Sequence, residues 1–328
     1  MDGLLVLDKP AGPTSHDVVA RMRRVLREKR IGHTGTLDPM ATGVLLLVLG
    51  KATRLATFLS ASDKSYDAVV RFGFATDTAD AHGRPIGSVS GSAIPSRDAI
   101  DAALDPFRGT FMQQPPAFSA KKVDGERSHK LARAARATAD ARLKPSRSEE
   151  ALPAPPALPA QASVTAHAIR IVSVDGDRVT LQLDCSAGFY VRSLAHDLGE
   201  RLGTGAHLAT LRRTRIGDFT IDQALNLERA ERDPPCAAAA VVPLAGMLPR
   251  LASVTLTPEG VKRAVHGRDI GPGDQLSAVG SRPSTMAPEP SAISHQPFVK
   301  LLDPRGELVA IARLTGAGGV LHPSVVLV

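Results

Sequence analysis

A single carboxylate, Asp38, stands in the segment GHTGTLDPMATGVLLL, after a loop of glycine and threonine residues and directly before Pro39. The segment contains no second carboxylate, so it does not match a hydrolase that works with a pair of them. A lone aspartate is better suited to act as a nucleophile or a single base. An Asp-Pro pair is also a common start of a turn, and on local spacing alone the turn is the more frequent explanation.

Tyrosines are scarce, because the chain has only Tyr66 and Tyr190, no tryptophan, and 3% aromatic residues. An enzyme that takes one base out of a folded RNA needs a flat side chain for stacking, a group that holds the base out, and a cation near the reacting carboxylate. Tyr66, His33 and Arg192 have suitable types for these roles. Each also has an ordinary explanation: a half-buried strand tyrosine, a loop histidine bonded to backbone, and an arginine that caps a carbonyl.

Composition limits the function classes. A chain of 328 residues with 43% apolar content can form one large core and a smaller appended domain. The net charge of +7 and the pI near 9.7 favour a polyanionic partner such as nucleic acid. The two cysteines are too few for a disulfide framework and lack metal-ligand spacing, so we expect a reducing interior and no metal. No stretch reaches the roughly 20 apolar residues of a membrane helix, and we expect no membrane partner.

The elements that must position Asp38 begin at the amino terminus. Residues 4–7 predict a short buried strand that ends before Pro10. Thr14 or Ser15 can cap a following helix that has Asp17 in its first turn. The apolar face of this helix consists of Val18, Met22, Val25 and Leu26. A basic stretch, which could contact phosphates or be a solvated face, contains Arg21, Arg23, Arg24, Arg27, Lys29 and Arg30.

Further strands and helices alternate without a βαβ rhythm, which indicates an α+β fold. Residues 66–74 and 179–185 have the alternation of strands, the second after a turn at residues 175–177. Leucines four apart predict a helix immediately after SAGFYVR. Near the carboxyl terminus, FVKLLD, ELVAIARL and VVLV predict strands of a small β-barrel.

Two stretches are too rich in alanine, proline and charge to bury much surface, namely residues 136–164 and 281–297. We therefore expect mobile surface excursions there. The run DPPCAAAA after residue 232 indicates an inter-domain connection.

Taken together, these segments resemble the bacterial tRNA pseudouridine-55 synthases of the TruB type. The resemblance covers nearly all of residues 3–225, in the family's order. It is carried by GLLVLDKPAGPTSHDVV, IGHTGTLDPMATGVLLLVLGKATRL, KSYDAVVRFGFATDTADAHG, QQPPAFSAKKVDGER, CSAGFYVRSLAHDLG and GAHLATLRRTRIGDF.

The resemblance implies roles for individual residues. Asp38 takes the position of the nucleophile, Tyr66 that of the tyrosine that stacks on the target base, and His33 that of the residue that occupies the space left by the flipped bases. The segment GERSHKLAR matches the family's thumb loop, with His129 where an aromatic residue is usual.

The remaining site residues follow from the same resemblance. Tyr190 corresponds to a tyrosine that contacts the substrate, Arg192 to the arginine that pairs with the nucleophile, and Leu211 to an apolar contact with the base. Lys9 matches the lysine of the family's KPxGxTS segment and is expected at the substrate site. Asp80 stands where a family carboxylate can join the arginine network.

The implied fold is the pseudouridine synthase fold, with a central mixed, largely antiparallel sheet flanked by helices, and a small C-terminal PUA-like β-barrel. We expect a catalytic domain at residues 1–232, with an insertion at about 136–163, a linker at 233–248, and a PUA-like RNA-binding domain at 249–328.

The implied reaction is the isomerisation of uridine to pseudouridine at position 55 in the T-arm loop of tRNA, by base flipping. It involves no redox change and no group donor, so no cofactor is expected. The expected partner is the tRNA T-arm. We expect a cytoplasmic monomer without an obligatory protein partner.

Three other functions compete with this one. A tRNA-folding chaperone with a silent synthase site would have the same basic charge, but Asp38, Tyr66 and Arg192 are all present and favour catalysis. An RNA-guided synthase of a ribonucleoprotein would share the aspartate loop, yet this chain has no added lysine-rich tail. A nucleoside hydrolase would release free uracil, whereas an isomerase conserves mass.

Overall fold

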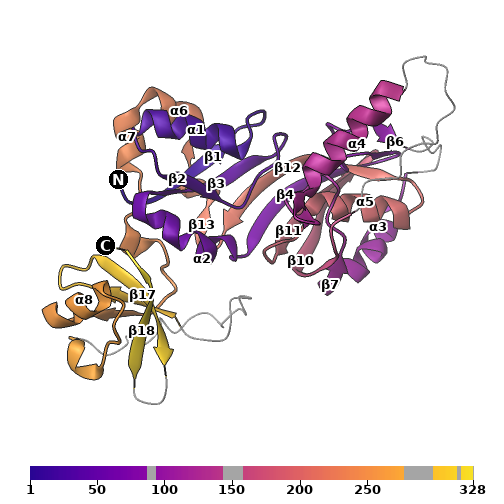
Figure 1. Cartoon of the computed structure of the whole chain (residues 1–328). Coiled ribbons are helices and arrows are strands. Elements are labelled where there is room, and N and C mark those ends of the chain that lie inside the picture. Colours follow the sequence, from indigo (N-terminus) through magenta and orange to yellow (C-terminus); the bar gives the residue numbers. More distant parts are fainter. Residues whose placement is uncertain (87–93, 143–157, 277–297, 316–318, 328) are drawn as a thin grey trace. The chain divides into compact units, whose positions relative to one another are not determined.

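The computed structural model describes residues 1–86, 94–142, 158–276, 298–315 and 319–327 (Figure 1). The chain divides into two compact units, Met1–Asp63 with Arg213–Val328, and Lys64–Arg212. Within the described residues, no helix is long and apolar enough to cross a membrane. The same residues contain no group of three or more His, Cys, Asp or Glu side chains that could hold a metal ion.

The first unit is built on strand β1 (Gly3–Lys9), which pairs antiparallel with β3 (Thr42–Leu49). Two further strands complete this sheet region, β2 (Ile31–Thr34) antiparallel to β3 and β14 (Leu225–Asn226) parallel to β1. The predicted buried strand at residues 4–7 is confirmed. These mixed pairings confirm the α+β class.

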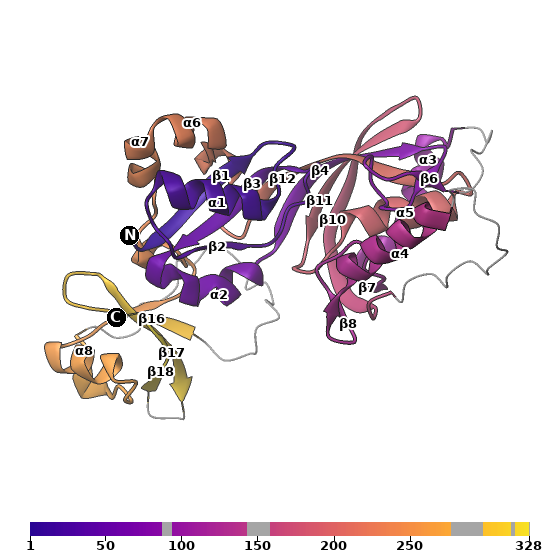
Figure 2. The same ribbon diagram turned by 45° about the horizontal axis from the view of Figure 1, so that its top comes forward.

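Helix α1 (Ser15–Val25) follows β1 as predicted, and Thr14 is its N-cap. The Thr14 hydroxyl oxygen accepts the Asp17 N–H at 3.1 Å, and the Asp17 carboxylate accepts the Thr14 N–H at 2.8 Å, which forms a capping box. Val18 and Met22 are buried on the apolar face. Helix α6 (Leu227–Arg232) lies beside α1 (Figures 1 and 2).

The segment expected as an inter-domain connection is more ordered than the sequence indicated. It contains helix α7 (Pro234–Ala239), which the Asp233 carboxylate caps by accepting the Cys236 N–H at 3.0 Å. Proline is favoured at the first helical position and alanine within a helix. Beyond α7, Val242 pairs with Leu4 of β1 through two backbone hydrogen bonds of 2.8 and 2.9 Å.

The tail strands are confirmed as β16 (Phe298–Leu302), β17 (Leu308–Thr315) and β18 (Val320–Val326). With β15 (Ser253–Thr255) they form a sheet of order β15-β16-β17-β18, against which α8 (Pro258–Val265) packs (Figure 1). The closed barrel that we expected is not confirmed.

The second unit contains an antiparallel sheet region of order β4-β11-β10-β7 (Figure 2). These strands are β4 (Lys64–Phe72), β11 (Arg178–Cys185), β10 (Ala162–Asp175) and β7 (Gly109–Gln113). The two strands predicted at residues 66–74 and 179–185 are confirmed, the first ending at Phe72. Helices α3 (Arg97–Leu104) and α5 (Val191–Arg201) pack together beside this region.

Helix α5 begins at Val191, inside SAGFYVR rather than after it. Tyr190 is its N-cap residue and supplies no capping hydrogen bond from its own side chain. Instead, the amide of Gln113 accepts the Tyr190 N–H at 2.8 Å and donates to the Tyr190 carbonyl at 3.0 Å. The distant Gln113 thus fixes a helix start that local sequence does not reveal.

The excursion expected at residues 136–164 is wrong for residues 136–142, which belong to a helix, and for residues 162–164, which belong to β10. Helix α4 (Ser128–Arg142) continues through its first seven positions, because alanine, frequent in SHKLARAARATADAR, is the strongest helix former. Residues 143–157 and 277–297 lie outside the described residues, so the expected mobility there stays a prediction.

The remaining elements are shorter or connect these regions. They are α2 (Ala56–Ser60), β5 (Ala75–Thr76), β6 (Pro85–Ile86), β8 (Lys122–Val123), β9 (Glu126–Arg127), β12 (Ala206–Ile216), β13 (Phe219–Thr220) and five 3-10 helices (Gly50–Leu55, Asp105–Phe107, Ile221–Gln223, Leu244–Gly246, Pro272–Asp274).

Candidate active site

Asp38 lies in the loop between β2 and β3 and is half-buried. Its carbonyl oxygen accepts the Ala41 N–H at 3.1 Å, so the residue begins a turn, as the Asp-Pro pair indicates. The turn uses the backbone carbonyl of Asp38 and not its carboxylate. Turn and nucleophile are therefore compatible at this position.

The backbone on either side of Asp38 is fixed by the segment between β1 and α1. The buried Ser15 hydroxyl accepts the Leu37 N–H at 2.9 Å and donates to the Leu37 carbonyl at 3.1 Å. The Pro39 carbonyl accepts the Gly12 N–H at 2.8 Å. The loop thus has the rigid support that a reacting side chain needs.

Lys9, at the end of β1, is fully buried beneath this loop segment. Its ammonium donates to the carbonyl oxygens of Pro10 and Pro13 at 2.9 Å and of Pro39 at 3.4 Å. The pKa of Lys9 is lowered to about 8, mainly by burial and also by the Arg213 guanidinium, while the Asp38 carboxylate opposes this shift. Lys9 is thus a buried cation that binds loop carbonyls and lies within electrostatic reach of Asp38.

His33, on β2, packs edge-to-face against His16, with ring centroids 5.1 Å apart. The pKa of His33 is lowered to about 4, mainly by burial and also by the charges of His16 and Arg213. The ring is therefore neutral at pH 7. Its buried Nδ1 has no hydrogen-bond partner among the described residues. The alternative explanation of His33, a loop histidine bonded to backbone, therefore does not account for this nitrogen.

Arg213, on β12, is a buried residue near Asp38 that the sequence analysis did not single out. It is 1% exposed, and its guanidinium donates to three carbonyls, those of Val44 at 2.8 Å, Gly35 at 2.9 Å and Thr36 at 3.4 Å. One local signal was available, since Arg213 lies two positions after Leu211 on a strand and therefore shares its inward face.

Arg192, on α5, and Asp80 form a buried pair in the second unit. Arg192 Nη1 lies 3.6 Å from Asp80 Oδ2, and both side chains are less than a tenth exposed. The guanidinium also donates to the carbonyls of Thr78 at 3.1 Å and Phe118 at 2.9 Å. The Asp80 carboxylate accepts the Thr78 hydroxyl at 2.7 Å and the His82 N–H at 3.0 Å. The expected place of Asp80 beside the arginine is confirmed.

The other predicted residues of the second unit lie on three different elements. Tyr66 is a buried residue of β4, opposite Leu183 of β11. Tyr190 is the half-buried N-cap residue of α5, and Leu211 is a buried residue of β12. The predicted site residues thus form two groups, Asp38, His33 and Lys9 in the first unit, and Tyr66, Tyr190, Arg192 and Leu211 in the second.

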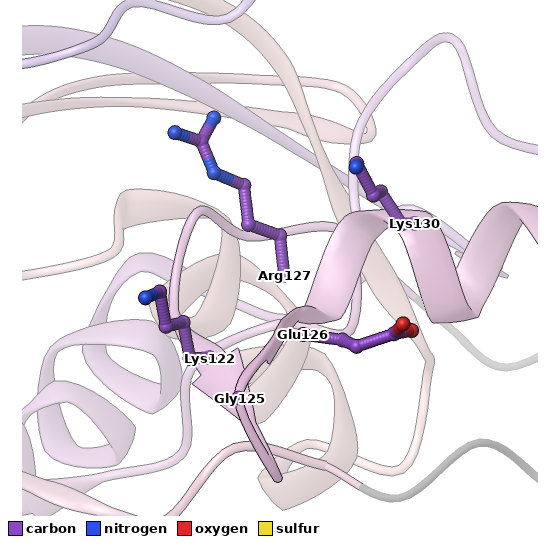
Figure 3. A pocket seen from close by; sticks show the side chains of 5 residues that line it. All are labelled: Lys122, Gly125, Glu126, Arg127 and Lys130. Carbon is purple, nitrogen blue, oxygen red and sulfur yellow. The ribbon is translucent and has the colours of Figure 1, made fainter.

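A basic pocket of about 360 Å³ lies at the β8–β9 hairpin and the first turn of α4 (Figure 3). Asp124 and Gly125 form the two-residue hairpin turn, and both have positive φ. The pocket is lined by Lys122, Gly125, Glu126, Arg127 and Lys130. Its three cationic side chains and one carboxylate give the pocket a net positive charge, which is suited to an anionic ligand.

Two family models match the chain. One, described as "TruB family pseudouridylate synthase (N terminal domain)", matches residues 23–148. The other, described as "tRNA pseudouridylate synthase B C-terminal domain", matches residues 192–232.

Similar curated proteins cover nearly the whole chain. The "tRNA pseudouridine synthase B" of Solibacter usitatus is 39% identical over 333 residues, covering 100% of both chains. That of Corynebacterium diphtheriae is 40% identical over 311 residues, covering 87% of this chain and 97% of the relative.

Solved structures share the fold. A structure titled "Structure of H/ACA RNP bound to a substrate RNA containing 2'-deoxyuridine" matches with a TM-score of 0.68 at 23% identity, covering 99% of this chain and 85% of that one. A "Cbf5-Nop10-Gar1 Complex" matches with a TM-score of 0.66 at 24% identity, with the same coverage. Both likenesses support a pseudouridine synthase fold with a mixed sheet and helices.

Proposed function

The chain belongs to the TruB family of pseudouridylate synthases, and we propose that Asp38 is the nucleophile with which it acts. The enzyme isomerises uridine to pseudouridine in tRNA. We further propose that the target is position 55 in the T-arm loop, and that the enzyme flips this uridine out of the stack to reach it.

The way the Asp38 loop is held is the observation that most supports this role. Buried groups bind the backbone on both sides of Asp38, through Ser15 at Leu37 and through Lys9 at Pro39, while Asp38 itself is only half-buried. A reacting group must be both fixed and accessible. Because Lys9 is fully buried, we propose that it serves the substrate site through this loop rather than by direct contact.

The reaction breaks the bond between N1 of uracil and C1′ of ribose, turns the base, and joins C5 to C1′. The proton released from C5 balances the one gained at N1, so no atom or electron is supplied from outside. Asp38 can attack C1′, or it can remove the C2′ proton to give a glycal. Both first steps remain open, and neither requires a cofactor.

The other site residues act on the same uridine in this proposal. Tyr66 stacks on the target base, Arg192 pairs with the nucleophile, and Asp80 orients Arg192 through the contact of 3.6 Å. Tyr190 and Leu211 contact the substrate. His33 occupies the space left by the flipped bases, and its low pKa keeps this ring uncharged.

In this proposal, two further regions bind the RNA beyond the target uridine. The basic pocket at Lys122, Arg127 and Lys130 fits the phosphates of the T-arm. We also propose that the chain consists of a catalytic domain at 1–232, a linker at 233–248 and a PUA-like RNA-binding domain at 249–328. We further propose that the protein is monomeric and cytoplasmic.

Pseudouridine mapping tests this function. Bulk tRNA would be compared from cells that lack this gene product, from cells that carry the wild-type gene, and from cells that carry Asp38→Asn. We expect pseudouridine in the T-arm only with the wild type, because asparagine keeps the shape of the side chain and removes its charge.

The competing functions give other results. A silent chaperone would leave the T-arm uridine unchanged in all three strains, and a nucleoside hydrolase would release free uracil from purified tRNA.

A further inference from the structure

We infer that Arg213 is a positioning residue that holds the Asp38 loop in its reactive conformation by binding carbonyl groups from both ends of the loop. The inference rests on the proposed role of Asp38. Gly35 and Thr36 precede Asp38, and Val44 follows it, so one guanidinium joins the two ends of the segment that carries the carboxylate.

The shape of the guanidinium is suited to this task. A planar fork with several N–H donors can bind carbonyls that arrive from different directions, whereas a lysine ammonium is a single point of charge. Arg213 is 1% exposed; its contact with Val44 is buried, and its contacts with Gly35 and Thr36 are partly buried. Removing the side chain would leave these carbonyls without their donors, which destabilises the loop locally.

A close backbone contact sets where this guanidinium lies. A Cβ at Gly43 would lie 2.1 Å from the carbonyl oxygen of Arg213, and Gly43 has φ of +102°, which side chains disfavour. The glycine therefore lets the chain that follows Asp38 touch the backbone of β12 directly. Arg213 then reaches back along the loop from this contact.

Two buried cations support different parts of the loop. Lys9 binds the carbonyl of Pro39, immediately after Asp38, and Arg213 binds the carbonyls farther out on both sides. The charge of Arg213 also lowers the pKa values of Lys9 and His33. An arginine stays charged across the working pH range, so this support does not titrate.

The test compares purified Arg213→Met and Arg213→Lys with wild type, at saturating tRNA and corrected for the folded fraction. We expect Arg213→Met to lower kcat by about 100-fold, because small displacements of a reacting group have effects of this size. KM for tRNA should stay unchanged, since the loop is displaced rather than an RNA contact removed. Arg213→Lys should restore part of the loss at pH 6.5.

The pH dependence separates positioning from general stability. Lys9 and His33 lie within electrostatic reach of Arg213, and Asp38 lies in the loop that Arg213 binds. A lysine at 213 would lose its proton readily for the same reason as Lys9. The ratio of kcat for Arg213→Lys to kcat for wild type should therefore fall as pH rises from 6.5 to 9. The same ratio for Arg213→Met should stay flat.

Arg215→Lys is the matched control. Arg215 lies on the same strand and donates to the carbonyl of Gly217 at 3.1 Å. Because Gly217 lies outside the Asp38 loop, the kcat of Arg215→Lys should match that of wild type.

Wild-type kcat in folded Arg213→Met, or a loss confined to KM, would overturn the inference. If Arg213→Met does not fold, a pH-independent, wild-type kcat in Arg213→Lys would do the same. An inactive wild type, or an active Asp38→Asn, would instead show that the proposed function fails.

Discussion

In the proposed function, the backbone and the side chain of Asp38 serve different purposes. The carbonyl closes a turn with Ala41, which is what the Asp-Pro pair predicts from local sequence. The role of the carboxylate could not be predicted in that way, because a turn aspartate and a nucleophile have the same local pattern. The scarcity of tyrosines and the family resemblance pointed to the second role.

Arg213 shows what a residue-level prediction misses. Strand alternation in LRRTRIG separates Arg213 from Arg212 but not from Arg215, and nothing in the segment indicates that Arg213 binds the carbonyls of Gly35, Thr36 and Val44. Its partners lie about 170 to 180 positions away in the chain, and only the folded backbone brings them within reach.

Lys9 gives a prediction about stability and pH. Its pKa falls from 10.5 in the unfolded chain to about 8 when folded, so between these values the unfolded chain binds more protons. The free energy of unfolding should therefore gain from this residue as pH rises from about 8 to 10.5, by up to about 3 kcal/mol. The cost of burying the charged form is fully present below pH 8.

Urea denaturation of wild type and Lys9→Met at several pH values measures this. The difference in unfolding free energy, wild type minus variant, should increase between pH 8 and 10. A difference that stays constant with pH would show that Lys9 has an ordinary pKa.

At the scale of elements, local patterns predicted an element correctly where its apolar residues were regularly placed and a cap or a turn marked its end. Strand β1, helix α1 with its Thr14 cap, and strand β11 were all predicted. The continuation of α4 to Arg142 and the helix α7 were not predicted, because alanine-rich stretches with prolines fit both a helix and a linker. The start of α5 depends on Gln113, a contact across 77 positions.

The junction of α1 with the Asp38 loop gives a second prediction, on two adjacent hydroxyls. Ser15→Ala removes both bonds to Leu37 and should cost about 1–3 kcal/mol, because a buried N–H loses its acceptor. It should also lower kcat about tenfold or more by loosening the loop, without a change in KM.

Thr14→Ala is the matched control, since it removes only the helix cap. It should cost about 1 kcal/mol of stability and leave kcat of the folded enzyme unchanged. Equal kcat values for the two variants would show that the bonds from Ser15 do not position the loop.

At the scale of the whole molecule, the proposed site residues come from segments spread over 200 positions. Periodicity can place each of these residues on a strand or helix, but it cannot say which strands pair. The family resemblance supplied the fold and the set of residues. The C-terminal region was predicted as strands, yet its expected barrel was not confirmed, because strand patterns do not specify closure.

The proposed function predicts an enzyme that works alone. Purified protein should convert the T-arm uridine of an unmodified tRNA transcript without any added RNA or protein. The fold is shared with a protein of an H/ACA RNP. Activity that appears only after a second RNA is added would contradict this expectation. Pseudouridine in the transcript can be counted by chemical mapping, with a transcript that carries cytidine at the target position as the control.

Single-turnover conversion by purified Asp38→Asn measures the role of Asp38 most directly. With excess enzyme and a tRNA transcript, we expect a Kd within about threefold of the wild-type value and a conversion rate lower by about 10⁴-fold or more, because only the reacting group is lost. Conversion by Asp38→Asn within about tenfold of the wild-type rate would contradict the assignment of Asp38 as the nucleophile.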